Sequence, residues 1–345
     1  MSTELTRTKR VSSTEVARLA GVSQTTVSHV MNGRMDVSIP ASTRERVLEA
    51  AKSLRYRPNS LARSLVRGRT QTIGLMLPCL GSDFHGQIVD GIRTALLEEG
   101  YNLLIVDTGA EPEHEAGQAN FLLEHRVEGL FCIAGARTAI EMPKWLKDLA
   151  MENVPCVVID DHRHGDQVDC VVSDDAHGIE LAMAHLVEHR HTRIAYMNRS
   201  PSPLSNTGYG ERRTAFYEKL GKFGLRNLYG DITARADGIE HLTVALDPQF
   251  QRADRPTAII ADNDYWLADI YEYAAGRGLS IPADLAVIGF GNQLVSQILK
   301  LTSVSQEARQ MGRTAAKQLL SRINQSVFEP VTIYTPTRLE LRQSA

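Results

Sequence analysis

The amino-acid sequence predicts an all-helical N-terminal domain followed by an α/β body of two lobes, and three observations support this. Short helical segments separated by tight turns fill residues 1–57. From residue 72, continuous apolar runs alternate with amphipathic helical stretches, the pattern of parallel strands covered on both faces. Residues 1–70 carry 13 Lys/Arg and 5 Asp/Glu, whereas the remainder carries 25 and 36, so a basic segment precedes an acidic body.

The N-terminal domain has the signals of three helices. Residues 12–15 form a capping box, Gly21 ends the helix that follows, and Ser23 caps a second helix. Pro58 stops a third helix. We expect the inward faces to contain Val16, Leu19 and Ala20, then Val27, Val30 and Met31, and finally Val47, Leu48, Ala51 and Leu54.

The first two helices have the spacing of a helix-turn-helix, whose second helix enters the major groove of DNA. With its apolar residues inward, the second helix presents Gln24, Thr25, Ser28 and His29 outward. Gln can bond adenine through two hydrogen bonds, and His can donate to guanine, so this face suits base reading. A merely solvated face is the alternative, and the surrounding positive charge counts against it.

A basic amphipathic linker, residues 58–71, joins this domain to the body. The linker is too short to be a stable helix alone, so we expect it to order only when something holds it. The body, residues 72–345, has too many strand–helix units for one sheet, which predicts two doubly wound parallel lobes. We assign about 72–170 plus 303–330 to the first lobe, and about 171–302 plus 331–345 to the second. Ligands of such sheets bind beyond the carboxyl ends of the strands.

Several classes of protein are disfavoured. No apolar run is long enough to cross a membrane and the N-terminus lacks a signal peptide, so we expect a cytoplasmic protein. Nucleotide-binding, nucleophile-elbow and zinc-protease motifs are absent, and Asp160–Asp161 and Asp174–Asp175 are adjacent pairs that would point apart on a strand. We therefore expect no enzyme and no cofactor. The cysteines, which lack metal-ligand spacing and are expected to be buried thiols, are Cys79, Cys132, Cys156 and Cys170.

The chain resembles the lactose-repressor (LacI) family of bacterial regulators over nearly its whole length. The resemblance rests on VARLAGVSQTTVSHVMNG, on TRERVLEAAKSLRYRPNSLARSL and on the TIGLMLP strand after them. Later blocks follow in the family's order, among them PTAIIADND, IPADLAVIGF and LTSVSQEARQMGRTAAKQLL. The resemblance implies a body with the fold of periplasmic sugar-binding proteins.

The resemblance also implies a role for each residue that matches a family position. Operator bases would be read by Gln24, Thr25 and His29, and the DNA backbone held by Ser23, Thr26, Ser28 and Asn32. The linker would enter the minor groove through Asn59, Ala62, Arg63 and Leu65, with Leu65 wedging open a base step beside the same leucine of a second subunit. The effector would be bound by Phe84, His85, Asp160, Asp161, Arg212, Asn263, Asp264 and Gln293.

The sequence departs from the family at two ligand-binding positions. Gly291 stands where many members carry an Asp, and Ile232 stands where the lactose and purine repressors place an aromatic ring. Neither a galactoside nor a purine can therefore be assumed as effector. No leucine-heptad tail follows PTRLELR, which favours a dimer over a tetramer.

These observations predict a transcriptional regulator, a repressor that binds a palindromic operator as a homodimer under the control of a sugar or related metabolite. Whether the effector acts as inducer or corepressor stays open. One alternative is a regulator of the same fold controlled by a phosphoprotein partner. Another is a sugar-binding receptor without DNA function, which the basic N-terminal domain and the missing signal peptide disfavour.

Overall fold

The computed structural model describes residues 11–34, 36–56, 69–109, 111–133, 142–152, 154–198, 208–234, 238–323, 325 and 329–345. The chain divides into two compact units, residues 1–70 and residues 71–345. We call the first the N-terminal unit and the second the body. The linker residues expected in the minor groove, Asn59, Ala62, Arg63 and Leu65, lie outside the described residues.

The N-terminal unit contains the three expected helices, α1 (Ser13–Ala20), α2 (Gln24–Met31) and α3 (Ala41–Ser53). The capping box is formed, since the Ser12 N–H donates to the Glu15 carboxylate at 2.7 Å and the Glu15 N–H donates to the Ser12 hydroxyl. Gly21 ends α1 at φ +64°, a left-handed conformation that glycine adopts without strain. A small core joins the helices, and its buried members are Val16, Ala17, Ala20, Val27, Val30, Val47, Ala50 and Ala51.

Two leucines expected in this core are exposed instead. Leu19 on α1 is 57% exposed and Leu48 on α3 is 51% exposed. The smaller Ala17 and Ala50 are buried in their helices, because three short helices that pack closely leave little room for larger side chains. The prediction of these two inward positions was wrong.

The body contains two six-stranded sheets. The first has the order β11-β5-β4-β3-β1-β2, with all neighbours parallel, and the second has the order β12-β10-β9-β8-β6-β7, in which only β12 is antiparallel. The strands of the first sheet are β1 (Thr72–Leu77), β2 (Asn102–Asp107), β3 (Leu130–Ile133), β4 (Cys156–Ile159), β5 (Asp169–Ser173) and β11 (Thr332–Thr335). Those of the second are β6 (Ile194–Asn198), β7 (Asp231–Thr233), β8 (Ala258–Ala261), β9 (Ala286–Phe290), β10 (Thr302–Ser305) and β12 (Arg338–Glu340).

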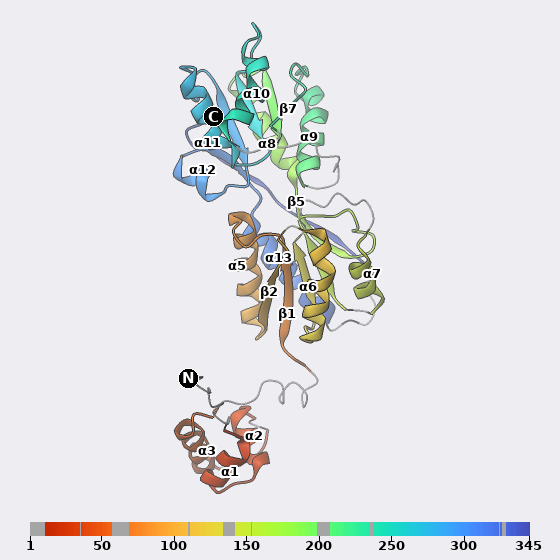
Figure 1. Cartoon of the computed structure of the whole chain (residues 1–345), viewed down its shortest axis with the longest axis vertical. Coiled ribbons are helices and arrows are strands. Elements are labelled where there is room, and N and C mark those ends of the chain that lie inside the picture. The colour runs from red at the N-terminus through yellow and green to blue at the C-terminus, as the bar shows by residue number, and fades with distance from the viewer. Residues whose placement is uncertain are drawn as a thin grey trace, which may run out of the picture. The chain divides into compact units, whose positions relative to one another are not determined.

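Helices cover both faces of each sheet, which makes two lobes (Figure 1). On the first sheet, α5 (Asp83–Glu98) and α13 (Ala308–Ile323) pack on one face, and α6 (Pro112–Glu124) and α7 (Lys144–Met151) on the other. On the second, α8 (Asp175–Glu188) and α9 (Gly208–Lys222) face α10 (Ile239–Phe250) and α11 (Trp266–Gly276) across the sheet. The short α12 (Leu294–Ile298) follows β9. The expected doubly wound architecture is confirmed.

The chain crosses between the lobes three times, and the crossings correct the expected lobe boundaries. β5 and β11 lie wholly in the first sheet, whereas β10 lies in the second. The expected boundaries cut through β5 after Cys170 and through β10 after Thr302, and they placed β11 in the opposite lobe. A strand pairs along its whole length, so the crossings occur at strand ends, after Ser173, Ser305 and Thr335.

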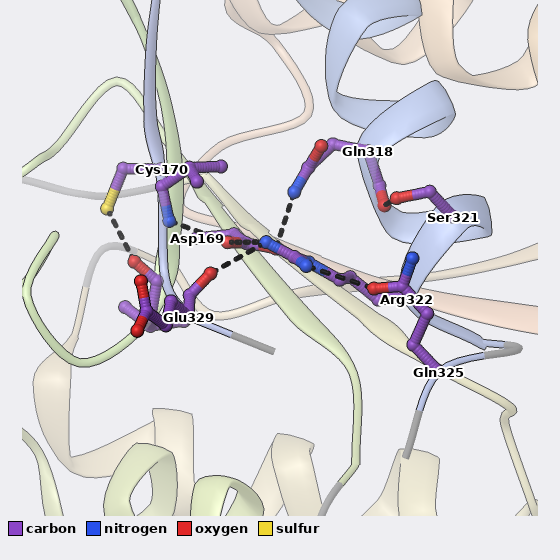
Figure 2. Close-up of polar contacts among 9 residues, drawn as sticks. Asp169, Cys170, Gln318, Ser321, Arg322, Gln325 and Glu329 are labelled. Carbon is purple, nitrogen blue, oxygen red and sulfur yellow. Dashed lines mark hydrogen bonds and ion pairs between the residues drawn. The ribbon is translucent and has the colours of Figure 1, made fainter. Parts of the chain in front are cut away.

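A buried ion pair holds the segment between α13 and β11, which precedes the last of these crossings, against the first sheet (Figure 2). Asp169, at the start of β5, accepts from the guanidinium of Arg322 on α13 at 2.7 and 3.1 Å. Its carboxylate also accepts from the Gln318 side chain and from the Val331 N–H, both at 2.9 Å. Because it accepts from both segments, the fully buried Asp169 carboxylate ties the end of α13 and the approach to β11 to the sheet.

Candidate DNA-binding and effector sites

The second helix of the N-terminal unit presents the expected polar face. Gln24, Thr25 and Ser28 are exposed and His29 is half-buried, while Val27 and Val30 point into the core. The Gln24 amide donates to the Ser13 hydroxyl at 2.7 Å, so α1 orients this side chain. Gln24, Thr25, Ser28 and His29 therefore form one face that is available to a ligand outside the unit.

The four residues expected at the DNA backbone lie at the two ends of α2. The Ser23 hydroxyl caps the helix by accepting from the Thr26 N–H at 3.1 Å, and it also lies 2.9 Å from the Thr26 hydroxyl. At the other end, the Asn32 amide donates to the Ser28 hydroxyl at 3.2 Å. A capped helix N-terminus carries partial positive charge, which suits a phosphate.

In the body, the carboxyl ends of both sheets carry polar residues, and Arg212 is the most tightly held. Its Nε donates to Asp175 Oδ2 at 2.7 Å, its Nη1 donates to the carbonyl of Asp262 at 2.7 Å, and its guanidinium lies 4.1 Å from the Phe290 ring centroid. Burial raises the pKa of Asp175, and the neighbouring Arg212 opposes that rise. Arg212 is thus oriented by its own lobe before any effector arrives.

Asp160 approaches this group from the first lobe. It follows β4 in a left-handed backbone conformation, with φ +64°. Its pKa is raised to about 7, chiefly because of burial, and Arg212 opposes this rise while Asp175, Asp161 and Glu211 contribute to it. Among the residues that the structure describes, none donates a hydrogen bond to this carboxylate. Its carboxylate oxygens can therefore still accept from a ligand.

Two of the expected effector residues are held by the protein itself. Asp161 accepts from the Arg163 side chain at 2.6 to 3.0 Å and from its N–H at 2.9 Å. Asp264 is fully buried and accepts from the Ser303 hydroxyl and the Gln293 N–H, both at 2.7 Å. Both residues follow a strand, as expected, but their carboxylates accept hydrogen bonds from neighbouring protein groups.

Asn263 and Gln293 lie together beyond β8 and β9, where the Gln293 amide donates to Asn263 Oδ1 at 3.5 Å. Gln293 is 3% exposed, and its Oε1 has no hydrogen-bond partner within the described part of the chain. The preceding Gly291 adopts φ +117°, and a Cβ there would lie 3.1 Å from Gln293 Nε2. The glycine thus leaves room for the Gln293 side chain.

Phe84 and His85, which were expected to follow the first strand, lie in the first turn of α5. Phe84 is buried in the core of the first lobe. The His85 ring Nδ1 lies 3.0 Å from the carbonyl oxygen of Cys79, which requires a proton on that nitrogen. Burial lowers the pKa of His85, so the ring is neutral at pH 7.

Asp175, which pairs with Arg212, was not expected to be a site residue. Asp174 and Asp175 were interpreted as a pair on a strand, but Asp174 caps α8 by accepting from the His177 N–H at 2.9 Å, and Asp175 begins the helix. An Asp before an amphipathic stretch is a helix-start signal, so the sequence did contain a clue.

Two contacts between the lobes were also unforeseen. Asp83 Oδ2 accepts from the Leu294 N–H at 2.9 Å, and His162 Nε2 lies 2.9 Å from Glu211 Oε1. Asp83 and His162 belong to the first lobe, Leu294 and Glu211 to the second. Each contact therefore spans the space between the two sheets.

Other kinds of site find less support. Within the described ranges, no group of three or more His, Cys, Asp or Glu is placed to hold a metal ion, and no helix is long and apolar enough to span a membrane. Cys132, Cys156 and Cys170 are buried thiols, but Cys79 is exposed, contrary to expectation, because it lies in the loop after β1.

Comparison with known proteins decides the family. A model of the bacterial regulatory proteins of the lacI family matches residues 14–59, and a model of the periplasmic binding protein-like domain matches residues 183–345. The transcriptional repressor PurR of Vibrio atlanticus is 30% identical over 317 residues, covering 91% of this chain and 92% of that protein. The chain belongs to the lacI family. It is a DNA-binding transcriptional regulator with an effector-binding body.

Further comparisons agree with this lacI-family assignment. Catabolite control protein A of Priestia megaterium is 30% identical over 337 residues, covering 96% of this chain and 98% of that protein. The Lac repressor dimer bound to operator and the anti-inducer ONPF shares the fold, with a TM-score of 0.81 at 23% identity over 97% of this chain and 99% of that chain. A complex of the regulator CelR with cellobiose has a TM-score of 0.68 at 26% identity over 97% of this chain and all of that chain.

The structure places both departures of this lacI-family chain. Ile232 on β7 is 2% exposed and belongs to a hydrophobic core of the second lobe, so its side chain is committed to packing. Gly291 contributes no side chain, and Gln293 occupies the adjoining space. Any effector must be recognised without an aromatic ring or a carboxylate at these positions.

Proposed function

We propose that this regulator acts in the cytoplasm as a homodimeric repressor that binds a palindromic operator and responds to a small molecule held between the lobes of the body. The observation that carries the proposal is the convergence of Asp160, from the first lobe, with Arg212 and Asp175, from the second. A ligand that contacts both lobes can favour one lobe arrangement over another, which is the requirement for allosteric control.

The DNA-binding roles follow from the polar face of α2. In this proposal, Gln24, Thr25 and His29 read base edges in the major groove, and Ser23, Thr26, Ser28 and Asn32 hold the phosphates. Leu65 of each linker enters the minor groove and bends the duplex, with Asn59, Ala62 and Arg63 beside it.

Exposed apolar side chains of the body support a dimer. Leu294 and Ile298 of α12 are 57% and 66% exposed, Leu299 follows them at 43%, and Leu80 before α5 is 60% exposed. The Leu294–Asp83 hydrogen bond brings α12 next to the start of α5, which Leu80 precedes by three positions. A second copy of the chain would cover a surface of this kind.

The effector is proposed to be a sugar or a related metabolite. Two structurally similar regulators were solved with sugars, namely CelR with cellobiose and a LacI-family regulator from Enterococcus faecium with ribose. Asp160, Asn263 and Gln293 offer hydrogen-bonding groups of the kind that sugar hydroxyls require. In this proposal Phe84 and His85, in the first turn of α5, also contact the effector. In this proposal Asp161 and Asp264 keep their hydrogen bonds with Arg163 and Ser303 and so hold the neighbouring Asp160 and Asn263 in place.

One experiment tests the proposal in two steps. The full chain is used to select bound sequences from random duplex DNA, and a palindromic consensus is expected. A panel of sugars and central metabolites is then screened for release from, or tighter binding to, the selected operator. Leu65→Ala is expected to weaken operator binding and reduce bending. No preference for any duplex, with or without metabolites, contradicts the function, and undiminished bending by the variant contradicts the wedge.

A further inference from the structure

We propose that the two contacts between the lobes, Asp83 with Leu294 and His162 with Glu211, form a clasp that holds the body closed and so positions the effector-binding groups. Asp83 and Glu211 are then positioning residues, and the effector site is pre-formed in part before the ligand binds. The inference rests on the proposed effector site between the lobes and concerns how that site is assembled.

The Asp83 carboxylate lies at the N-termini of two helices, α5 of the first lobe and α12 of the second. Asp83 is the first residue of α5, where a negative charge is favourable. The first residue of α12, Leu294, donates its N–H to the same carboxylate, and Gln293, which precedes it, supplies no side-chain cap. The cap that α12 lacks in its own lobe is therefore provided by the other lobe.

Both ends of this contact are anchored in their own lobes. Phe84 and Ile88 hold the start of α5 in the core of the first lobe. In the second lobe, the Asn292 N–H donates to the Ser303 hydroxyl at 3.0 Å, and Arg342 donates to Asn292 Oδ1 at 2.6 Å. A change in the angle between the lobes must therefore stretch or break the Asp83–Leu294 bond.

The second contact lies beside the effector-binding residues. His162 is two positions after Asp160, and Glu211 directly precedes Arg212. Both side chains are about three-quarters shielded, at 24% and 26% exposure. The hydrogen bond to Glu211 raises the pKa of His162, with smaller contributions from Asp161 and Asp175, and the Tyr334 ring lies 6.0 Å away. Breaking this contact removes a restraint on His162, close to Asp160 in the chain, and on Glu211, which is next to Arg212.

A hydrogen bond of ordinary net strength changes an equilibrium about fivefold. Two such contacts therefore change the ratio of closed to open bodies by roughly one order of magnitude or more, if they act independently. A shift of this size can turn an open body that is populated at a few percent into a substantially populated state. Effectors redistribute populations between states that differ in free energy by amounts of this order.

The test measures the distance between the lobes in the full-length protein without any ligand. Spin labels are attached through Glu113→Cys on α6 and Glu240→Cys on α10, both exposed, in a background in which the exposed Cys79 is replaced by Ser. Pulsed electron resonance then gives the distance distribution. Asp83→Ala and Glu211→Ala are each expected to increase the long-distance population about fivefold, and the double variant to increase it further.

Matched variants separate the clasp from a general loss of stability. Asp90→Ala, also on α5, removes contacts with Arg93 and Arg309 that stay within the first lobe, and Glu218→Ala alters an exposed residue on α9. Both should leave the distribution unchanged. Asp83→Asn keeps an oxygen that can accept from the Leu294 N–H, so it should restore the closed distances.

The clasp is refuted if the double variant has the same distances as the unmodified protein, or if the unmodified protein is already fully open. Because no ligand enters this measurement, either result leaves the operator and metabolite experiment to judge the proposed function. Conversely, a protein that responds to no metabolite but opens when Asp83 and Glu211 are removed retains the clasp and loses the effector role.

Discussion

Asp175 and Arg212 form an ion pair from which solvent is almost excluded. The Arg212 Nε lies 2.7 Å from Asp175 Oδ2, and the two side chains are 3% and 1% exposed. The Ser173 hydroxyl donates to the same carboxylate, and Gln306 donates to Ser173 at 2.8 Å. Residues next to two of the lobe crossings thus support the pair, so its loss would disturb the body as well as the effector site.

Arg212→Ala is expected to lower the free energy of unfolding by about 3–5 kcal/mol, because it leaves the Asp175 carboxylate buried without its partner. Arg213→Ala, at the next position, removes an exposed pair with Asp231 and should cost less than about 1 kcal/mol. Denaturant titration measures both values. Equal losses in the two variants would show that the buried pair contributes no more than the exposed one.

Arg212 is also expected to take part in the effector response, and the stability cost complicates the simple test. Arg212→Lys retains a positive charge near Asp175 but cannot bond Asp175 and the Asp262 carbonyl in the same planar arrangement. We expect this variant to fold, to bind the operator without effector, and to lose most of the effector response. A normal response of the folded variant would remove Arg212 from the effector site.

Asp160→Asn is expected to stabilise the body progressively as the pH rises above about 4. The pKa of Asp160 is raised to about 7 by burial, so its contribution to stability is full below the unfolded value near 3.8 and is lost as pH rises through 7. Asn imitates the protonated form and tolerates the left-handed backbone. The free energy of unfolding of Asp160→Asn should begin to exceed that of the parent protein above about pH 4. The difference should reach about 2 kcal/mol at pH 8, after allowance for partial exposure.

Denaturant titrations of the Asp160 variant between pH 4 and pH 8 measure this gap. Asp166→Asn, which changes an exposed carboxyl in the same segment between β4 and β5, is the control and should show no such pH dependence. A constant difference between Asp160→Asn and the parent protein at all pH values would mean that Asp160 is ionised normally.

His29→Ala is expected to relax the base preference at one operator position by about 1–3 kcal/mol, because a side chain on the exposed face of α2 would no longer donate to a base edge. Binding to a set of single-base operator variants measures this preference. Glu49→Ala, on the exposed side of α3, is expected to leave every preference unchanged. If His29→Ala also leaves them unchanged, His29 does not read a base.

The fold could be predicted from the sequence largely because its signals are local. The Ser12–Glu15 capping box and the turn at Gly21 depend on residues a few positions apart, and both are formed. The alternation of apolar runs with helical stretches likewise needs only short segments. The exposure of Leu19 and Leu48 was not predictable in this way, because it depends on how closely the three helices pack.

The effector site was less predictable for a physical reason. The sequence shows which polar residues follow a strand, but not which donors they meet after folding. Asp161 and Asp264 satisfy their carboxylates with Arg163 and Ser303, whereas Asp160 finds no such donor among the described residues. The Asp83–Leu294 contact joins residues more than two hundred positions apart and involves a backbone N–H, which no residue pattern reveals.

Alanine substitutions at two glycines, Gly312 of α13 and Gly86 of α5, are expected to change the free energy of unfolding in opposite directions. A Cβ on Gly312 of α13 would lie 2.1 Å from the Ile88 carbonyl oxygen of α5, so Gly312→Ala must separate the helices, at a cost of about 2–3 kcal/mol. A Cβ on Gly86 of α5 would meet nothing within 4 Å, so Gly86→Ala should gain about 0.5–1 kcal/mol from helix propensity. Urea denaturation measures both, and a gain for Gly312→Ala would mean that the two backbones do not touch.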